Sequence, residues 1–224
     1  ETGDGYRVAL MARRKTDVLL AGIQEWPTGV FADPTSVEGR GAWFSFAFWL
    51  RTIASAFLDI DPDELQSGMR TYQGDGIPYA EIFLCDKLEN GAGYCKFLGQ
   101  SEIFEELLRH ADPDAKPNGQ ESVAAQWLSS AHLGVCDTSC NKCLRDYGNM
   151  PYHGLLDWRL ALDMARLASG ESRIDLNSSW KGYENPWQGA NGDAIASALK
   201  KLHFVPSGTV SDLRVFVRTQ QNRN

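Results

Sequence analysis

The segment from Ala42 to Leu58 reads AWFSFAFWLRTIASAFL and decides what kind of fold this chain builds. Its apolar residues recur at intervals of three and four, as they do along one face of an α-helix. The residues that follow this interval are Trp43, Phe46, Ala47, Leu50, Ile53, Ala54 and Phe57. Phe44, Phe48 and Trp49 widen the apolar stripe. The segment therefore predicts a core helix that is covered on more than one side, in preference to a helix that displays a docking surface for a partner.

The same segment is excluded as a membrane span. A helix that crosses a bilayer needs about 20 mostly apolar residues, whereas this stretch is interrupted by Ser45, Arg51, Thr52 and Ser55. Residues 1–5 also lack the basic flank and the apolar core of a secretory signal. We therefore expect a cytoplasmic protein with no membrane partner.

Length and composition indicate one ordinary globular unit. The chain has 224 residues, of which 43% are hydrophobic and 23% are charged, and this excludes a disordered chain, a coiled coil and collagen. A chain of this size buries enough surface to fold without disulfides, so residues 1–224 are expected to form a single domain. Its start so close to a first strand suggests a piece cut from a longer polypeptide.

Charge limits the partners of this chain. It carries 22 basic and 29 acidic residues and a formal net charge of −7, so it lacks the positive field with which a polycation coats nucleic acid. A local basic face is compatible with a negative net charge. For contacts with phosphate groups, the sequence offers Arg13, Arg14 and Lys15 in an early turn, and Lys142 and Arg145 in a later segment.

Residue patterns outside the apolar segment predict a mixed fold. The candidate strands are residues 6–12, 17–23, 80–86 and 213–217. The candidate helices are residues 101–110, 120–133, 155–168 and 193–202. Asp61 and Pro62 predict a further helix start, and a loop is expected at residues 72–78. The fold class is therefore α+β, with mainly helices packed on a small mixed or antiparallel sheet.

Three of the five cysteines lie together in the run CDTSCNKC, at Cys136, Cys140 and Cys143. A tight turn between thiols that are separated by three and by two residues points their sulfur atoms toward one position, and Zn²⁺ binds four N or S donors tetrahedrally. Disulfide pairing would leave one of the three thiols over, and a redox Cys-x-x-Cys usually opens a helix after a strand. The run therefore predicts one structural zinc site, with buried or redox cysteines as the alternatives.

The fourth zinc ligand has to come from another part of the chain. The candidates are His153, Cys85 and Cys95. Of these, His153 is nearest in sequence, ten residues after Cys143, and it precedes the helix predicted at residues 155–168. We therefore choose His153, and the two cysteines remain alternatives.

A glycine-rich turn at residues 88–94 follows the strand predicted at residues 80–86. A strand, a glycine turn and a helix can hold phosphate on backbone N–H groups. However, no Gly-Lys-Ser/Thr follows this turn, and the third glycine of a dinucleotide-binding fingerprint is missing. We therefore expect Gly91 and Gly93 to serve the backbone geometry of the turn.

Taken together, these motifs resemble a known family. They are the strand and turn at residues 82–94, then Cys136-x3-Cys140-x2-Cys143-Leu144-Arg145-x-Tyr147-x-Asn149, then His153 and Leu156-Asp157-x-Arg159. They are similar to the MrfA-type zinc-binding domain, which is found at the C-terminal end of DEAD/DEAH-box DNA helicases and in DrmB-like proteins of the DISARM phage-defence system. The similarity covers residues 80–167 and extends more loosely over residues 42–70.

The resemblance implies a division of the chain and a role for it. Residues 80–167 would be the zinc-binding core, residues 1–70 the N-terminal strands and apolar helix, and residues 170–224 a C-terminal extension. The role would be that of an accessory domain with one structural zinc ion, acting on DNA in repair or in phage restriction. Its partner would be a superfamily-2 helicase motor, in the same polypeptide or in a separate subunit. Asn149 departs from the family, because some members have a fourth cysteine near this position.

The chain carries none of the motifs of a motor or of the common hydrolases. No Gly-Lys-Ser/Thr, Asp-Glu-x-His or arginine-rich helicase motif occurs in it, nor does Gly-x-Ser-x-Gly or His-Glu-x-x-His. We therefore expect no enzymatic activity of the isolated chain. The alternative is a small metal-dependent or cysteine-dependent enzyme, in which an open metal site or a pair formed by Cys143 and His153 does the chemistry.

Overall fold

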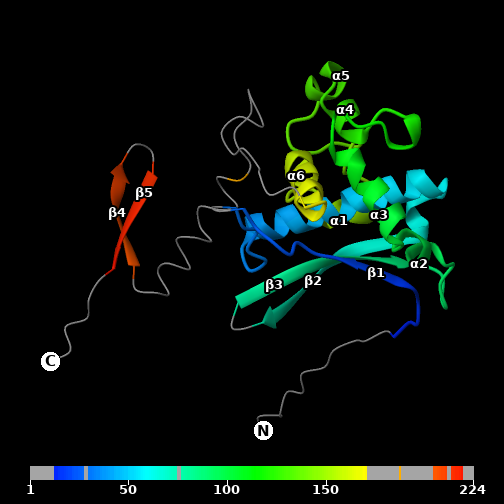
Figure 1. Cartoon of the computed structure of the whole chain (residues 1–224), viewed down its shortest axis with the longest axis horizontal. Helices are drawn as coiled ribbons and strands as arrows, with labels where there is room; N and C mark the ends of the chain where they lie inside the picture. The colour runs from blue at the N-terminus through cyan, green and yellow to red at the C-terminus, as the bar shows by residue number, and fades with distance from the viewer. Residues whose placement is uncertain are drawn as a thin grey trace, which may run out of the picture.

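Helices packed on one side of a small sheet make up the fold (Figure 1). The computed structural model describes residues 13–27, 30–74, 77–170, 187, 204–210 and 213–218. The sheet has the order β1-β3-β2 and is antiparallel, with β1 at Val18–Ala21, β2 at Leu65–Gly74 and β3 at Ile77–Asp86. The helices are α1 (Val37–Leu58), α2 (Tyr94–Leu98), α3 (Ser101–Leu108), α4 (Val123–Trp127), α5 (Ser130–Leu133) and α6 (Trp158–Ala168).

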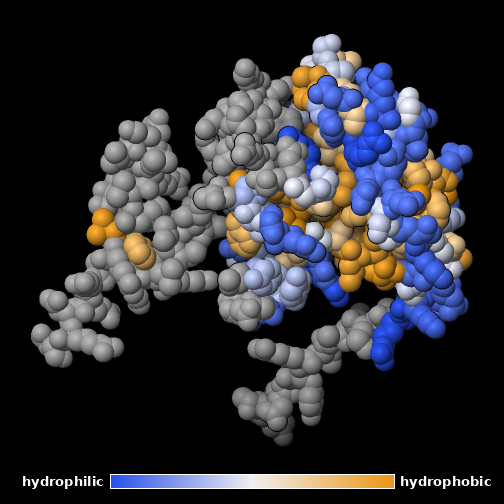
Figure 2. All heavy atoms as spheres, viewed as in Figure 1, coloured by the Kyte–Doolittle hydropathy of each residue, from blue (hydrophilic) through white to orange (hydrophobic). Residues whose placement is uncertain are grey.

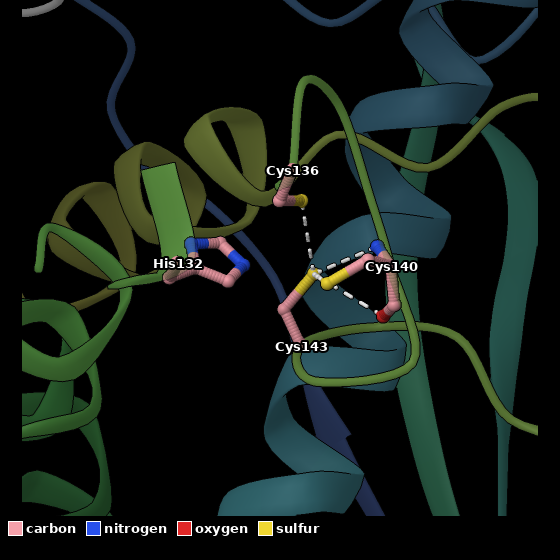
Figure 3. Close-up of side chains that lie close together, drawn as sticks. All are labelled: His132, Cys136, Cys140 and Cys143. Carbon is pink, nitrogen blue, oxygen red and sulfur yellow. Dashed lines mark hydrogen bonds between the residues drawn. The ribbon is translucent and has the colours of Figure 1, made fainter. Parts of the chain in front are cut away.

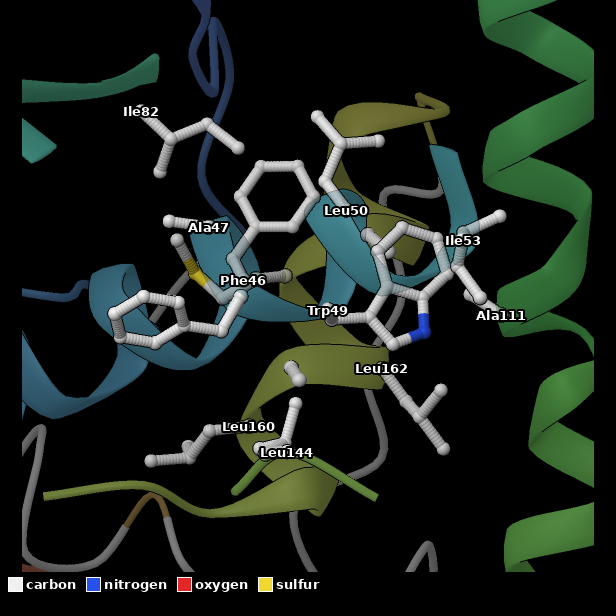
Figure 4. Packing of buried hydrophobic residues seen from close by; sticks show 14 of the residues in the cluster. Phe46, Ala47, Trp49, Leu50, Ile53, Ile82, Ala111, Leu144, Leu160 and Leu162 are labelled. Carbon is white, nitrogen blue, oxygen red and sulfur yellow. The ribbon is translucent and has the colours of Figure 1, made fainter. Parts of the chain in front are cut away.

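Helix α1 is the central element of this arrangement. Ser36 caps its N-terminus by accepting a hydrogen bond from the backbone N–H of Gly39. The helix packs against β2 and β3 on one side and against α6 on the other. Figure 4 shows Phe46 and Trp49 of α1 between Ile82 of β3 and Leu162 of α6. The prediction of a core helix that is covered on more than one side is confirmed.

The sheet presents one apolar face to α1. Successive side chains of a strand point to opposite faces, and in β3 the alternate residues Ala80, Ile82 and Leu84 are buried. Leu84 lies opposite Leu19 of β1 and opposite Ser67 of β2. The strands predicted at residues 17–23 and 80–86 are therefore confirmed as β1 and β3.

Strand β2 corrects the sequence-based prediction. Asp61 caps only a short 3-10 turn, Pro62–Glu64, by accepting a hydrogen bond from the backbone N–H of Asp63. The chain then enters β2, which pairs with β3 over ten successive residues. The helix predicted from Asp61 and much of the loop predicted at residues 72–78 are wrong, because pairing with a neighbouring strand outweighs the local signals.

Other predicted elements have mixed outcomes. The helix predicted at residues 101–110 is confirmed as α3, which continues into a 3-10 turn, Arg109–Ala111. The pattern at residues 120–133 is divided into α4 and α5. The strand predicted at residues 213–217 is confirmed as β5 (Leu213–Arg218), but it pairs with β4 (Phe204–Val210) in a second sheet and does not join the first one.

The fold class α+β is confirmed by this arrangement, while the extent of the domain stays a prediction. The strand predicted at residues 6–12 and the helix predicted at residues 193–202 lie outside the described residues. Within the extension at residues 170–224, Trp187 is fully buried and its indole N–H donates a hydrogen bond of 2.7 Å to Oδ2 of Asp163 in α6. None of the helices in the described ranges has the length and apolar character of a membrane span.

Candidate metal centre

The helix α5 and the loop after it carry a cluster of one histidine and three cysteines (Figure 3). His132 lies on α5, and the backbone N–H of Cys136 donates a hydrogen bond of 3.0 Å to the His132 carbonyl oxygen, one helical turn away. The chain then bends so that the N–H of Cys143 donates to the carbonyl oxygen of Cys140, also at 3.0 Å. One ligand atom of each of these four residues lies within 4.8 Å of the others. We call these four residues the His/Cys cluster.

The sulfur positions in the His/Cys cluster fit a tetrahedral ion. The Sγ atom of Cys143 lies 3.7 Å from Sγ of Cys136 and 3.7 Å from Sγ of Cys140. Four ligands around zinc, with Zn–S bonds of about 2.3 Å, place two sulfur atoms about 3.8 Å apart. A disulfide would need about 2.05 Å, and all three residues are free cysteines. The cluster is therefore compatible with a metal ion.

The ring of His132 is oriented as a metal ligand. Its Nδ1 atom lies 2.7 Å from the carbonyl oxygen of Trp127. Because a carbonyl oxygen only accepts, Nδ1 carries the proton and Nε2 has the free lone pair. Nε2 is buried and has no hydrogen-bond partner within the described part of the chain. A metal ion bound beside the three thiols would be coordinated by the lone pair of this buried nitrogen and would so satisfy it.

Backbone hydrogen-bond donors lower the pKa values of the thiols, whereas burial raises them. The N–H of Cys140 donates to Sγ of Cys143 at 3.0 Å, and the N–H of Lys142 donates to Sγ of Cys140 at 3.3 Å. Burial would raise the pKa of Cys140, yet the hydrogen bonds that its sulfur accepts lower it. Burial raises the pKa of Cys143 to about 11, and burial together with the charge of Cys143 raises the pKa of Cys136. A metal ion has to displace the protons of these two thiols, so its affinity falls as the pH is lowered.

We call residues 136–146 the cysteine loop, and two helices hold it in place. The backbone N–H of Trp158, at the start of α6, donates to the carbonyl oxygen of Thr138 at 2.8 Å, and its indole N–H donates to that of Asp137 at 3.1 Å. From the other side, the buried side chain of Arg51 in α1 forms an ion pair with Asp146. The His/Cys cluster is therefore joined to both helices of the core.

His132 replaces His153 as the fourth candidate ligand. The structure places Nε2 of His153 at 3.0 Å from the carbonyl oxygen of Asp146 and at 2.8 Å from Oδ1 of Asn149. Asn149 is fully buried and also donates from Nδ2 to the carbonyl oxygen of Leu144 at 2.7 Å. The His153 ring therefore fastens the 3-10 turn Tyr147–Tyr152. The spacing His132-x3-Cys136, one helical turn, is the sequence signal that could have pointed to His132.

The two remaining cysteines do not join the His/Cys cluster. Cys85 lies on β3, where the guanidinium group of Arg14 approaches its sulfur at 3.4 Å. Cys95 lies on α2, where its thiol contacts the carboxylate of Asp86. Within the described residues, the group that could hold a metal ion contains neither of them.

The buried carboxylate of Asp86 organises the glycine turn. It accepts hydrogen bonds from the backbone N–H groups of Ala92, Tyr94 and Cys95 at 2.7, 3.1 and 2.9 Å. Burial would raise the pKa of Asp86, but these bonds and the Cys95 thiol lower it. Gly91 has a φ of +79°, and a Cβ atom there would lie 2.5 Å from Oδ2 of Asp17. The backbone N–H groups of the turn therefore bind the carboxylate of Asp86. This agrees with the prediction that the glycines of the turn are needed for its backbone geometry.

We expect Asp86→Ala to lower the free energy of unfolding by about 3 kcal/mol, because three backbone N–H groups and the buried Cys95 thiol lose their acceptor. Urea denaturation at neutral pH measures this change. Asp112→Ala is the matched control, since Asp112 is exposed and accepts one local hydrogen bond from the N–H of Asp114. Equal losses in the two variants would contradict the role given to Asp86.

The basic residues predicted to contact nucleic acid lie in two places. Arg13, Arg14 and Lys15 are exposed in the segment before β1. Lys142 is exposed and Arg145 is half-buried in the cysteine loop. Contact of either group with DNA stays a prediction.

Comparison with known proteins finds a similarity to Druantia protein DruE of Escherichia coli (strain UMEA 4076-1). The two sequences are 29% identical over 175 residues, which is 75% of this chain and 8% of DruE. The chain therefore spans a small part of the length of this relative. No protein-family model matches the chain, and no solved structure matches it.

Proposed function

We propose that this chain is a zinc-stabilised accessory domain of a phage-defence complex that acts on DNA beside a superfamily-2 helicase motor. The observation that carries the proposal is the buried Nε2 of His132, without a partner in the described residues, beside three cysteine sulfurs. Four protein ligands close a zinc site, as in structural sites, whereas catalytic sites keep one position for water or substrate. The bound ion supplies folding free energy, and the isolated chain needs no catalytic activity of its own.

Two sequence similarities support a role of the domain in phage defence. The similarity to Druantia protein DruE extends over 75% of the chain. The motifs between residues 80 and 167 resemble the MrfA-type domain of DNA helicases and of DISARM proteins. Because the chain spans 8% of DruE and has no motor motifs, we place the motor elsewhere in a longer polypeptide or in a separate subunit.

The enzyme alternative receives less support from the geometry. Its cysteine-dependent form requires His153 to activate Cys143, but Nε2 of His153 is hydrogen-bonded to Asp146 and Asn149. Its metal-dependent form requires an open coordination position, whereas the His/Cys cluster offers four protein ligands. All five cysteines are free thiols, which fits the reducing cytoplasm, where we propose that the complex acts.

Phage restriction and zinc content together test the proposed function. In a host that carries the complete defence locus, Cys140→Ser is expected to abolish restriction, and the purified chain with this substitution is expected to lose its zinc. Cys85→Ser is the matched control, because Cys85 lies outside the His/Cys cluster, and it should keep both properties. Full restriction by a Cys140→Ser variant that has lost its zinc would refute a structural role of the metal in defence.

Helicase partnership needs a separate measurement. We expect DNA-stimulated ATP hydrolysis from the complete protein or complex and none from the 224-residue chain. A complete complex without ATPase activity would refute the partnership and leave the zinc site intact.

A further inference from the structure

The geometry points to a second functional surface, the sheet face opposite α1, as a binding site for single-stranded DNA. Bases would stack on its aromatic rings while its arginines contact phosphate groups. We call this surface the open sheet face, and the residues used below are Leu20, Arg70, Tyr72, Tyr79, Glu81 and Phe83. The inference rests on the proposed function, because a helicase motor supplies the single strand.

Strand register places these side chains on one face. Ile82 and Leu84 of β3 are buried on the side of α1, so Glu81 and Phe83 point to the opposite side. Leu20 lies opposite Phe83, and Arg70 lies opposite Glu81. In Figure 1, α1, α3 and α6 are all on the other side of the sheet.

Large apolar groups of this face are exposed. Tyr72 is 50% exposed and Leu20 is 43% exposed. In Figure 2, hydrophobic residues reach the surface over the part of the molecule where Figure 1 shows β1. Exposed apolar groups gathered on one face indicate an interaction surface.

Aromatic rings form two stacking positions on the open sheet face. Tyr72 and Tyr79 lie opposite each other, with ring centroids 5.6 Å apart and planes at 20°. The Phe83 ring crosses β2 where Gly68 leaves room, since a Cβ atom at Gly68 would lie 2.8 Å from Cζ of Phe83. Tyr79 and Phe83 are four residues apart on β3, which separates the two positions by about 13 Å. Rings on a sheet surface are the device with which single-strand binders hold bases of any sequence.

The charges on this face suit a polyanion. Arg70 lies between the two aromatic positions, and its side chain is 57% exposed and paired with Glu81, which is 18% exposed. Glu81 is the one acidic residue of the three strands on this face, because Asp86 points to the buried side.

At the other end of the face, Arg14 donates hydrogen bonds to the carbonyl oxygen of Lys87 at 2.8 Å and to Oε1 of Gln66 at 3.1 Å. Arg13 and Lys15 are exposed beside it. The open sheet face therefore carries Arg14 and Arg70 against the one acidic side chain of Glu81, in a chain whose net charge is −7. These guanidinium groups are the contacts that favour nucleic acid as the partner, through its phosphate groups.

Fluorescence anisotropy with a labelled oligothymidine at physiological salt tests this inference on the 224-residue chain. Tyr72→Ala is expected to weaken binding by about 5- to 160-fold, the loss of one stacked base. Tyr147→Ala is the matched control, since Tyr147 is 89% exposed on the 3-10 turn after the cysteine loop, and it should bind as the unmodified chain does. Zinc content and circular dichroism verify that each variant is folded.

The possible results separate this inference from the proposed function. Loss of binding in Lys142→Ala or Tyr147→Ala, with Tyr72→Ala unaffected, would place DNA on the cysteine loop and overturn the inference while the proposed function stands. Tighter binding of oligouridine or of duplex DNA would overturn the choice of single-stranded DNA. Absence of any binding would overturn the inference too, and zinc content and phage restriction would then decide separately about the proposed function.

Discussion

Removal of zinc by a chelator is expected to unfold the segment from α4 to the start of α6 and to lower the Tm of the chain by more than about 10 °C. A structural zinc site contributes on the order of 10 kcal/mol to folding, which is comparable with the whole stability of an ordinary domain, about 5–15 kcal/mol. The cysteine loop is fastened otherwise by Trp158 and by the ion pair of Arg51 with Asp146. These contacts cannot replace four metal bonds.

Circular dichroism melts at neutral pH, with and without chelator, measure this loss, and added zinc but not magnesium should restore the Tm. Hydrogen exchange should show the first loss of protection between residues 123 and 158, because α1 and the sheet bury their own apolar surface. A chelated chain with an unchanged Tm would show that the cysteine loop folds without metal.

His132→Ala is expected to reduce zinc affinity by at least about 100-fold, whereas His153→Ala should retain one zinc ion per chain. The reason is that Nε2 of His132 lies beside the three thiols and Nε2 of His153 is hydrogen-bonded to Asp146 and Asn149. His153→Ala should cost only about 1 kcal/mol of stability, through the loss of these hydrogen bonds. Competition with a chromophoric chelator measures the zinc affinity of each variant.

A second substitution separates ligation from packing at His132. The His132 ring also packs between Trp127 and Trp158, with centroid distances of 6.2 and 5.6 Å, so alanine removes packing as well as a ligand. His132→Cys supplies a thiol in place of the imidazole and should restore zinc binding, while His132→Gln should not. Zinc loss in His153→Ala together with retention in His132→Ala would reverse the assignment.

The three thiols were predictable from the sequence because the ligands within the run are close in the chain, and local turns bring them together. The fourth candidate ligand was harder to choose, since His132 lies four residues before the run and His153 lies ten residues after it. The choice between them depends on how Asp146 and Asn149 fold the following turn and engage His153. That contact depends on a capping arrangement between Asp146 and Asn149, which residue spacing alone does not reveal.

The fold, like the metal site, was predictable from the sequence only in part. Helix α1 follows from its own apolar pattern, and β3 from a run of apolar residues. Strand β2 has the polar residues Ser67 and Thr71 at positions on the side of α1, so its alternating pattern is weak. Pairing with β3 decides that it is a strand, and the Phe83 ring over Gly68 explains why a glycine is accommodated there.

The most direct test of a zinc-stabilised domain is the metal content of the chain purified without added metal or chelator. Native mass spectrometry together with elemental analysis should show one zinc ion per chain and no disulfide within Cys136–Cys143. A folded chain that carries no zinc, and whose Tm does not change when zinc is added, would contradict this prediction.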